Sequence, residues 1–193
     1  CIFRNNNAVK NNAVQENHQG YGGALQLGNT PENSQLIHYS VIDSTFEGNC
    51  AYRKGGALTL SAENPVLVQE CIFNDNYVYS PDPYLTATIQ GGAIYIFADQ
   101  GRKQSDTIKI LDCTFTDNSG VGSAIYVGQD SGDASKRPSI EIADGCQFST
   151  TSSENSNSTF IISESQRLAI HDISFTIEDM SKSDRIFPSL RLN

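Results

Sequence analysis

The amino-acid sequence predicts an all-β fold, a parallel β-helix of about five to six coils. Two short apolar motifs alternate strictly along the 193 residues, and each recurs at intervals of a few tens of residues. Self-similarity at this spacing is typical of stacked repeat architectures. The positions of the apolar residues around the first motif also predict a corner, so each coil needs at least three short strands.

The clearest copy of both motifs lies between Asn64 and Phe97. The first motif is Cys-x-Phe-x-x-Asn, and its Phe recurs at intervals of 43, 27, 42, 33 and 27 residues, at Phe3, Phe46, Phe73, Phe115, Phe148 and Phe175. The second motif is Gly-Gly-Ala followed by alternating apolar residues, and its Ala recurs at Ala24, Ala57, Ala93 and Ala124, with Phe160 and Ser189 as degraded matches. One coil therefore contains one strand of each kind plus loops of variable length.

Alternation within a strand predicts which side chains face the core. The expected inward pairs of the second motif are Leu25 and Leu27, Leu58 and Leu60, Ile94 and Ile96, Ile125 and Val127, and Leu190 and Leu192. The residues between them are expected to face solvent: Gln26, Thr59, Tyr95, Tyr126 and Arg191. An apolar residue also stands three positions before the Cys position, at Val41, Val68, Ile110, Ala143 and Ile170. An offset of three breaks the period of two, which predicts a corner between two sheets.

Stacking like residues on like predicts two further columns, one of cysteines and one of asparagines. Four of the five cysteines share one repeat position, Cys1, Cys71, Cys113 and Cys146, which predicts a buried column of thiols. Disulfides between successive coils stay open as an alternative, because neighbouring strands lie about 4.8 Å apart; Cys50 lies off the column and its state is also open. The asparagines Asn6, Asn49, Asn76 and Asn118, followed by Thr151, are expected to be structural, bonded to one another and to their own turns.

Charge and composition argue against two classes of function, nucleic-acid binding and membrane insertion. A net charge of −9 argues against a nucleic-acid partner, which needs a clustered basic surface. No apolar run reaches the length of a membrane span, so this segment is not expected to insert into a membrane. We interpret residues 1–193 as a single β-helix segment, and, because Cys1 stands within a repeat, as a fragment of a longer repeat protein.

A column of acidic residues is one candidate site. Asp43, Glu70, Asp112 and Asp172 stand directly before the Cys position, with Asp144 displaced by one residue in the remaining coil. Stacked carboxylates repel one another and favour a hard cation, so a Ca²⁺ ladder is one hypothesis. The alternative is that these acids only point into solvent, and no cofactor is otherwise expected.

A tyrosine patch is a second candidate. Tyr95 and Tyr126 are expected to stack outward in adjacent coils, near the loop that carries Tyr77, Tyr79 and Tyr84. Such a surface suits a glycan or a protein partner, although Tyr is also simply a good strand residue. Asn157-Ser158-Thr159 is an acceptor for N-glycosylation if the chain enters a secretory pathway.

The alternating motifs resemble those of a known family. GGAL at Gly22 and Gly55, GGAI at Gly91 and GSAI at Gly122 alternate with FRNN at Phe3, FEGN at Phe46, FNDN at Phe73 and FTDN at Phe115. This pattern is similar to the repeats of the polymorphic outer membrane proteins of chlamydiae and to those of large surface proteins of protists. The resemblance implies a right-handed parallel β-helix, exposed on the cell surface or extracellular, that serves adhesion or structural extension.

Catalysis is not expected. Pectin and pectate lyases and polygalacturonases share the fold class, but the sequence has no D-D, N-T-D or G-H-G motif, and His18, His38 and His171 stand in unrelated repeat positions. The prediction is a non-catalytic structural or adhesive segment of an extracellular surface or fibre-forming protein. The alternative is a carbohydrate-binding module, or a polysaccharide lyase or hydrolase. Expected partners are flanking coils or identical subunits placed end to end, and a glycan or cell-surface protein.

Overall fold

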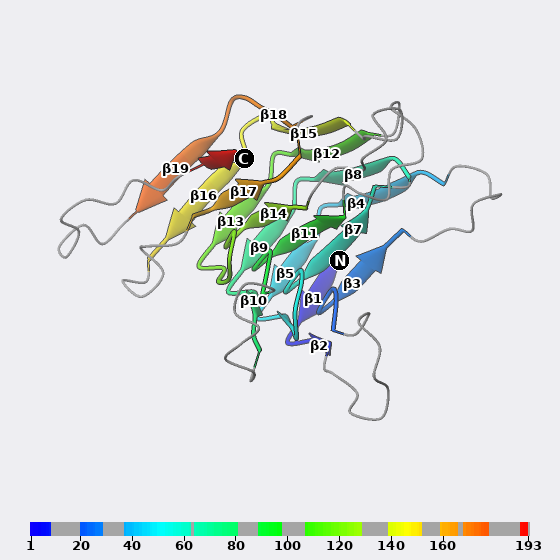
Figure 1. Ribbon diagram of the computed structural model, residues 1–193, viewed down its shortest axis with the longest axis vertical. Coiled ribbons are helices and arrows are strands. Elements are labelled where there is room, and N and C mark those ends of the chain that lie inside the picture. Colours follow the sequence, from blue (N-terminus) through cyan, green and yellow to red (C-terminus); the bar gives the residue numbers. More distant parts are fainter. Residues whose placement is uncertain are drawn as a thin grey trace.

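The computed structural model confirms an all-β chain built from stacked parallel strands. It describes residues 1–8, 20–28, 37–62, 64–80, 89–97, 107–128, 139–151, 159–165, 168–177 and 190–192. Figure 1 shows the strands in chain order, from blue at one end of the stack to orange and red at the other. The handedness and the number of coils stay predictions.

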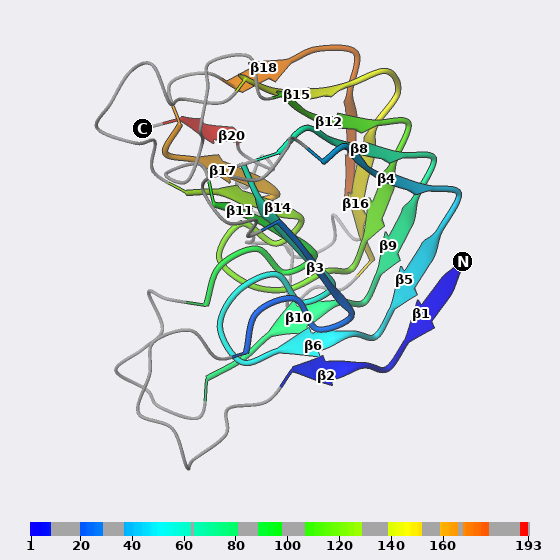
Figure 2. The same ribbon diagram turned by 90° about the vertical axis from the view of Figure 1, so that its right-hand side faces the viewer.

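Three large parallel sheets form the sides of the stack (Figure 2). The phenylalanine sheet contains β1 (Ile2–Arg4), β5 (Thr45–Glu47), β9 (Ile72–Asn74), β13 (Thr114–Thr116), β16 (Gln147–Thr150) and β19 (Ser174–Ile177). The glycine–alanine sheet contains β3 (Leu25–Leu27), β7 (Leu58–Ser61), β11 (Ile94–Phe97), β14 (Ile125–Val127), β17 (Ile161–Ser163) and β20 (Leu190–Leu192). The valine–isoleucine sheet contains β4 (Tyr39–Ile42), β8 (Val66–Gln69), β12 (Thr107–Leu111), β15 (Ser139–Ala143) and β18 (Leu168–Ile170).

A small fourth sheet joins the phenylalanine sheet to the glycine–alanine sheet. It contains β2 (Asn7–Ala8), β6 (Cys50–Ala51) and β10 (Tyr77–Val78). One coil therefore runs from the valine–isoleucine sheet to the phenylalanine sheet, then through this small sheet to the glycine–alanine sheet. The prediction of at least three short strands per coil is confirmed.

The predicted landmarks stack in vertical register. Phe73 pairs with Phe115, and Ile94 pairs with Ile125. The rings from Phe3 to Phe148 lie parallel, with centroids 4.8 to 4.9 Å apart. This separation equals the spacing of neighbouring strands, so each ring follows the rise of the backbone. The four rings from Phe46 to Phe148 are at most 1 % exposed, and each buried ring contributes about 1.5 to 3 kcal/mol to stability.

The glycine–alanine sheet supplies the opposite wall of the core. Its inward residues from Leu58 to Val127 are fully buried, as predicted, and Leu25 and Leu27 are partly buried at the first coil. Leu190 and Leu192 pair in register with β17. Phe160 replaces the small Ala of earlier coils, and its ring packs 5.7 Å from Phe175. The larger side chain fills the core at this end of the stack.

The glycine pairs are required for two different reasons. The first Gly of each pair has a positive φ, for example 63° at Gly55, which costs little only when no Cβ is present. The second Gly lies against the next coil: a Cβ on Gly56 would stand 2.0 Å from the carbonyl oxygen of Gly92. The motif therefore specifies both the turn and the close approach of the coils.

The asparagine column forms a continuous ladder that is buried from Asn49 to Asn118. The Nδ2 of Asn6, Asn49 and Asn76 each donates to the Oδ1 of the next asparagine, at 2.9 Å. The Nδ2 of Asn49, Asn76 and Asn118 also donates to the Phe carbonyl of the preceding coil. The prediction of bonding between stacked amides is confirmed. The left-handed residue of the turn is the one before each asparagine, namely Asn5, Gly48, Asp75 and Asp117.

Thr151 ends this column differently. Its backbone N and its hydroxyl both donate to the carboxylate of Asp117, each at 2.6 Å. In this coil a carboxylate from the residue before Asn118 therefore bonds the threonine that follows the asparagines in the column.

Candidate functional site

The acidic residues predicted as a metal ladder lie at one corner, between the valine–isoleucine and phenylalanine sheets. Asp43, Glu70, Asp112 and Asp172 all adopt the left-handed backbone conformation, with φ between 46° and 53°. Aspartate tolerates this conformation better than most residues, because its short polar side chain bonds locally. The backbone of the corner therefore accounts for the acidic type at most of these positions, and the calcium ladder stays a prediction.

One detail of the predicted column is wrong. Leu111 pairs with Ala143, so Asp144 follows at the same corner position as Asp112, and it shares the left-handed conformation with a φ of 53°. The extra residue of this coil is Gly145, also with a positive φ. For the same reason Ile142, rather than Ala143, pairs with Ile110 and occupies the apolar position of the corner.

His171 brings three charged groups together next to this corner. Its Nδ1 lies 3.2 Å from an oxygen of Asp172, and its Nε2 lies 3.2 Å from Oε1 of Glu141. Lys109 donates to the other oxygen of Glu141 at 2.7 Å. Ligand atoms of Asp144, His171 and Asp172 also lie within 4.8 Å of one another, and all three residues are exposed. This arrangement can hold a proton on the imidazole, and it offers oxygen and nitrogen ligands to a cation.

The charges of this group shift one another's pKa values. Asp172 and then Glu141 raise the pKa of His171, since both favour the imidazolium. The hydrogen bonds from Lys109 and His171 lower the pKa of Glu141. The sequence analysis did not predict this cluster, because Glu141 and His171 are 30 residues apart. The register of Ile142 with Ile170 would have revealed it, since this pairing brings Glu141 close to the residue that follows β18.

Tyr95 and Tyr126 stack as predicted, but the prediction that they face solvent is wrong. Their rings lie 5.7 Å apart with an interplanar angle of 13°, and they are only 5 % and 4 % exposed. They form a second apolar cluster on the outer side of the glycine–alanine sheet with Ile162 and Phe97. Thr59, another residue expected to face solvent, is also fully buried.

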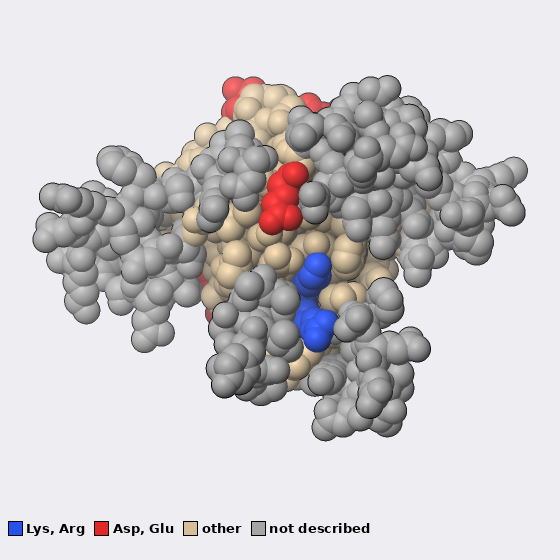
Figure 3. Space-filling model, viewed as in Figure 1, with Lys and Arg blue, Asp and Glu red and all other residues tan. Residues whose placement is uncertain are grey.

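The hydroxyl groups of both buried tyrosines have partners. The Nζ of Lys54 donates to Tyr95 at 2.8 Å and lies 4.2 Å from the centre of its ring. Tyr126 donates to a carboxylate oxygen of Glu164 at 2.6 Å. The pair therefore stabilises the sheet rather than presenting a flat open surface. On the face shown in Figure 3, one acidic and one basic group lie near the centre, and further acidic side chains are visible at the upper edge.

The other predicted tyrosines lie elsewhere. Tyr77 is 42 % and Tyr79 37 % exposed, at or beside β10 of the small sheet. Tyr79 contacts Tyr52 edge to face, with centroids 6.1 Å apart. Tyr77 and Tyr95 thus belong to different sheets, while Tyr84 lies outside the described residues. Asn157 and His18 also lie outside them, so the glycosylation site stays a prediction.

All five cysteines are free thiols. Cys71, Cys113 and Cys146 are buried in adjacent coils, as the predicted thiol column requires, and Cys1 is exposed. The thiols of Cys71 and Cys113 donate to backbone carbonyls two residues earlier, at 3.2 and 3.1 Å. Hydrogen bonds with Cys146 and Cys71, together with burial, raise the pKa of Cys113, so this thiol stays protonated. Burial likewise raises the pKa of Cys50.

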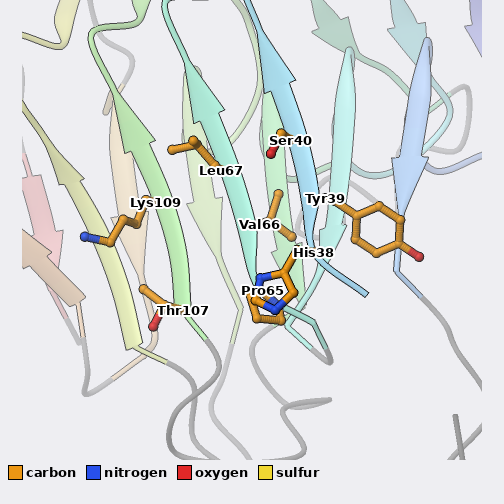
Figure 4. A pocket seen from close by; sticks show the side chains of 8 residues that line it. All are labelled: His38, Tyr39, Ser40, Pro65, Val66, Leu67, Thr107 and Lys109. Carbon is orange, nitrogen blue, oxygen red and sulfur yellow. The ribbon is translucent and has the colours of Figure 1, made fainter. Parts of the chain in front are cut away.

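A hollow on the outer side of the valine–isoleucine sheet was not predicted from the sequence. It has a volume of about 300 Å³ and is lined by residues of β4, β8 and β12 and the residues before β4 and β8: His38, Tyr39, Ser40, Pro65, Val66, Leu67, Thr107 and Lys109. In Figure 4 the ring of Tyr39 points away from the other side chains, and the same ring packs against the core. His38 and Pro65 lie together at one end, and Lys109 extends along the far side.

The hollow follows from the register of three strands. Ser40 pairs with Leu67, and Leu67 pairs with Lys109, so these outward residues form one row across the sheet. Ser40 is the small member of that row and is exposed, whereas Leu67 is half-buried. The signal that could have revealed the hollow is this small residue next to larger neighbours. It becomes visible only once the register is known.

The described residues include no helix long and apolar enough to cross a membrane.

Comparison with known proteins finds one repeat family. The model of the Chlamydia polymorphic membrane protein (Chlamydia_PMP) repeat matches residues 43–60. The matched stretch begins at the acidic corner residue Asp43, includes β5 and β6, and ends at Leu60 within β7. It therefore covers one Phe motif and the following Gly-Gly-Ala motif, and over this stretch the chain is similar to that repeat. No curated protein and no solved structure shows significant similarity to the chain.

Proposed function

We propose that this chain is a non-catalytic structural and adhesive segment of a large extracellular or cell-surface protein. The observation that carries the proposal is the match of residues 43–60 to the Chlamydia polymorphic membrane protein repeat, on a coil that the rest of the chain repeats. The stacked columns support a structural role. They hold the coils in register through a ladder of buried amides and a continuous row of rings.

Neighbouring coils are the first kind of partner that we infer. Phe3 stacks on Phe46 at 4.8 Å and is only partly buried, and β1 is an edge strand of its sheet. Edge strands and open ring faces favour pairing with another strand of the same kind. A flanking coil or an identical subunit would extend both the phenylalanine column and the amide ladder.

Labelling of intact cells tests the surface location. Antibodies against the purified chain should label intact cells of the source organism, and limited proteolysis of intact cells should remove the signal. Permeabilised cells and an antibody against a cytosolic protein serve as controls. Labelling that appears only after permeabilisation would contradict the proposal.

Beads that carry the chain should also attach to host or partner cells more than beads that carry a denatured sample.

A further inference from the structure

The hollow on the valine–isoleucine sheet has the size of a small ligand. Its volume of about 300 Å³ lies at the lower end of the range for small-molecule sites, which is roughly 300 to 1,000 Å³. This space suits one sugar ring rather than a long segment of polymer. The hollow lies on the outer side of the sheet, so a terminal unit of a larger glycan could enter it.

The lining combines apolar and hydroxyl-bearing groups. Leu67 and Pro65 provide apolar surface, while Ser40 and Thr107 carry hydroxyls and His38 carries an imidazole. A pyranose ring has the complementary distribution, because its C–H groups present an apolar face and its hydroxyls lie around the edge. Hydroxyls and imidazoles can both donate and accept hydrogen bonds, as sugar hydroxyls require.

The charge of the site argues for a neutral ligand. Its cation, Lys109, lies 2.7 Å from Glu141, whose other oxygen faces His171 at 3.2 Å. An anionic ligand would have to displace Glu141 or stand beside it, and two carboxylates at such a distance repel each other. A neutral sugar can instead pack against the aliphatic part of Lys109 without disturbing this pair.

From these observations we propose that the hollow binds one neutral pyranose unit of a surface glycan. The inference rests on the proposed adhesive function and names the class of ligand for it. It assigns Leu67 and Pro65 to the apolar contact, and Ser40, Thr107 and His38 to the sugar hydroxyls.

Binding of methyl glycosides tests the proposal directly. Saturation-transfer NMR and calorimetry with the methyl glycosides of glucose, galactose, mannose and N-acetylglucosamine should detect at least one ligand. The expected dissociation constant is on the order of millimolar, as for a ligand of about a dozen non-hydrogen atoms. Ser40→Phe fills the hollow and should weaken binding at least about tenfold, by the loss of nearly all contacts in the site.

A matched control is available on the same row of the same sheet. Ala169 is exposed and lies beyond Glu141, which separates it from Lys109 by one strand. Ala169→Phe introduces the same ring at the same kind of exposed position, and it should leave the affinity unchanged. Circular dichroism and thermal unfolding of both variants show whether the fold is retained.

The possible results of these experiments have different consequences for the site, for the class of ligand and for the proposed function. Absence of binding by all four glycosides, retention of binding in Ser40→Phe, or equal loss in Ala169→Phe would each overturn the site. Tighter binding of methyl glucuronide or sialic acid, abolished by Lys109→Met, would overturn the neutral class and establish an acidic sugar. Surface labelling of intact cells combined with no sugar binding would refute this inference alone and leave the proposed function in place.

Discussion

Asn76 is one of the most constrained polar side chains among the described residues. It is fully buried, accepts from the backbone N and the Nδ2 of Asn49, and donates to the carbonyl of Phe46 and to Oδ1 of Asn118. Asn76→Leu keeps a similar volume but removes all four of these hydrogen bonds from the buried ladder. Each unsatisfied buried polar group costs about 1 to 3 kcal/mol, so we expect the free energy of unfolding to fall by at least about 3 kcal/mol.

The same substitution two residues earlier is the control. Asn74 is the last residue of β9 and is only partly buried. Asn74→Leu should change the free energy of unfolding by less than about 0.5 kcal/mol. Urea unfolding monitored by circular dichroism compares both variants with the parent. Similar losses in the two variants would show that the amide ladder contributes little.

At the acidic corner, one substitution is expected to raise the free energy of unfolding instead of lowering it. Glu70 has a φ of 53° but lacks the short side chain that favours this conformation, whereas Asn tolerates it well. Glu70→Asn should therefore raise the free energy of unfolding by roughly 0.5 kcal/mol, and Glu70→Val should lower it, because a β-branched residue is strained at positive φ.

Calcium distinguishes the two interpretations of this corner. If the backbone alone selects these acids, added Ca²⁺ leaves the melting temperature of the parent unchanged, and this is the outcome we expect. A rise in melting temperature with Ca²⁺ that disappears in Asp112→Asn would establish the ladder instead. Asn keeps the backbone conformation at position 112, so the variant tests the charge separately.

Between elements, the pairing of β15 with β18 places a titratable group at the corner. The pKa of His171 is raised above its ordinary value of 6.5, mainly by Asp172, so the imidazolium stabilises the fold below pH 6.5. This contribution is lost as the pH rises through the raised pKa. The pKa of Glu141 is lowered from 4.5, so its contribution is present above pH 4.5 and is lost as the pH falls further.

The two effects predict greatest local stability between about pH 4.5 and 6.5. NMR titration of the imidazole should give a pKa above 6.5 in the parent and a lower value in Asp172→Asn, which retains the backbone conformation of the corner. The melting temperature of His171→Gln should approach that of the parent as the pH rises above neutrality. An unchanged pKa in Asp172→Asn would contradict the assigned contact.

The elements also show which parts of the structure follow from sequence. The Phe, Asn and Gly-Gly-Ala positions predict the strands, the corner and the register, because stacking repeats the same side chain in every coil. Counting back from Cys146 misplaced Asp144 by one position, because Gly145 is inserted between them. The strand pairing nevertheless keeps Asp144 at the same corner position as the other acids. Alternation also placed Tyr95 outside the core correctly but could not predict its burial, because a second cluster covers that side.

The candidate sites depend more strongly on contacts between coils. The hollow requires the row of Ser40, Leu67 and Lys109 from three coils, and the cluster around His171 requires Glu141 from the preceding coil. The identities of these residues carry no repeat signal. They occupy outward positions, where stacking places no demand on the side chain.

At the scale of the whole molecule, each coil contacts mainly the coils beside it, so the stack behaves as a linear array. Stability in such an array is the sum of single coils and nearest-neighbour interfaces. Phe115 lies within the stack, with ring centroids 4.9 Å from both Phe73 and Phe148. Phe115→Ala removes two of these interfaces at once and should cost about 3 to 5 kcal/mol.

Hydrogen exchange can show where this energy is lost. In the parent, protection should be highest in β9 and β13 and lower in the edge strands β1 and β19. In Phe115→Ala, exchange should accelerate most in β13 and its neighbours β9 and β16, while β1 and β5 keep most of their protection because their interfaces are unchanged. A uniform loss across all sheets would mean that the chain unfolds as a single cooperative unit, and the linear description would then be wrong.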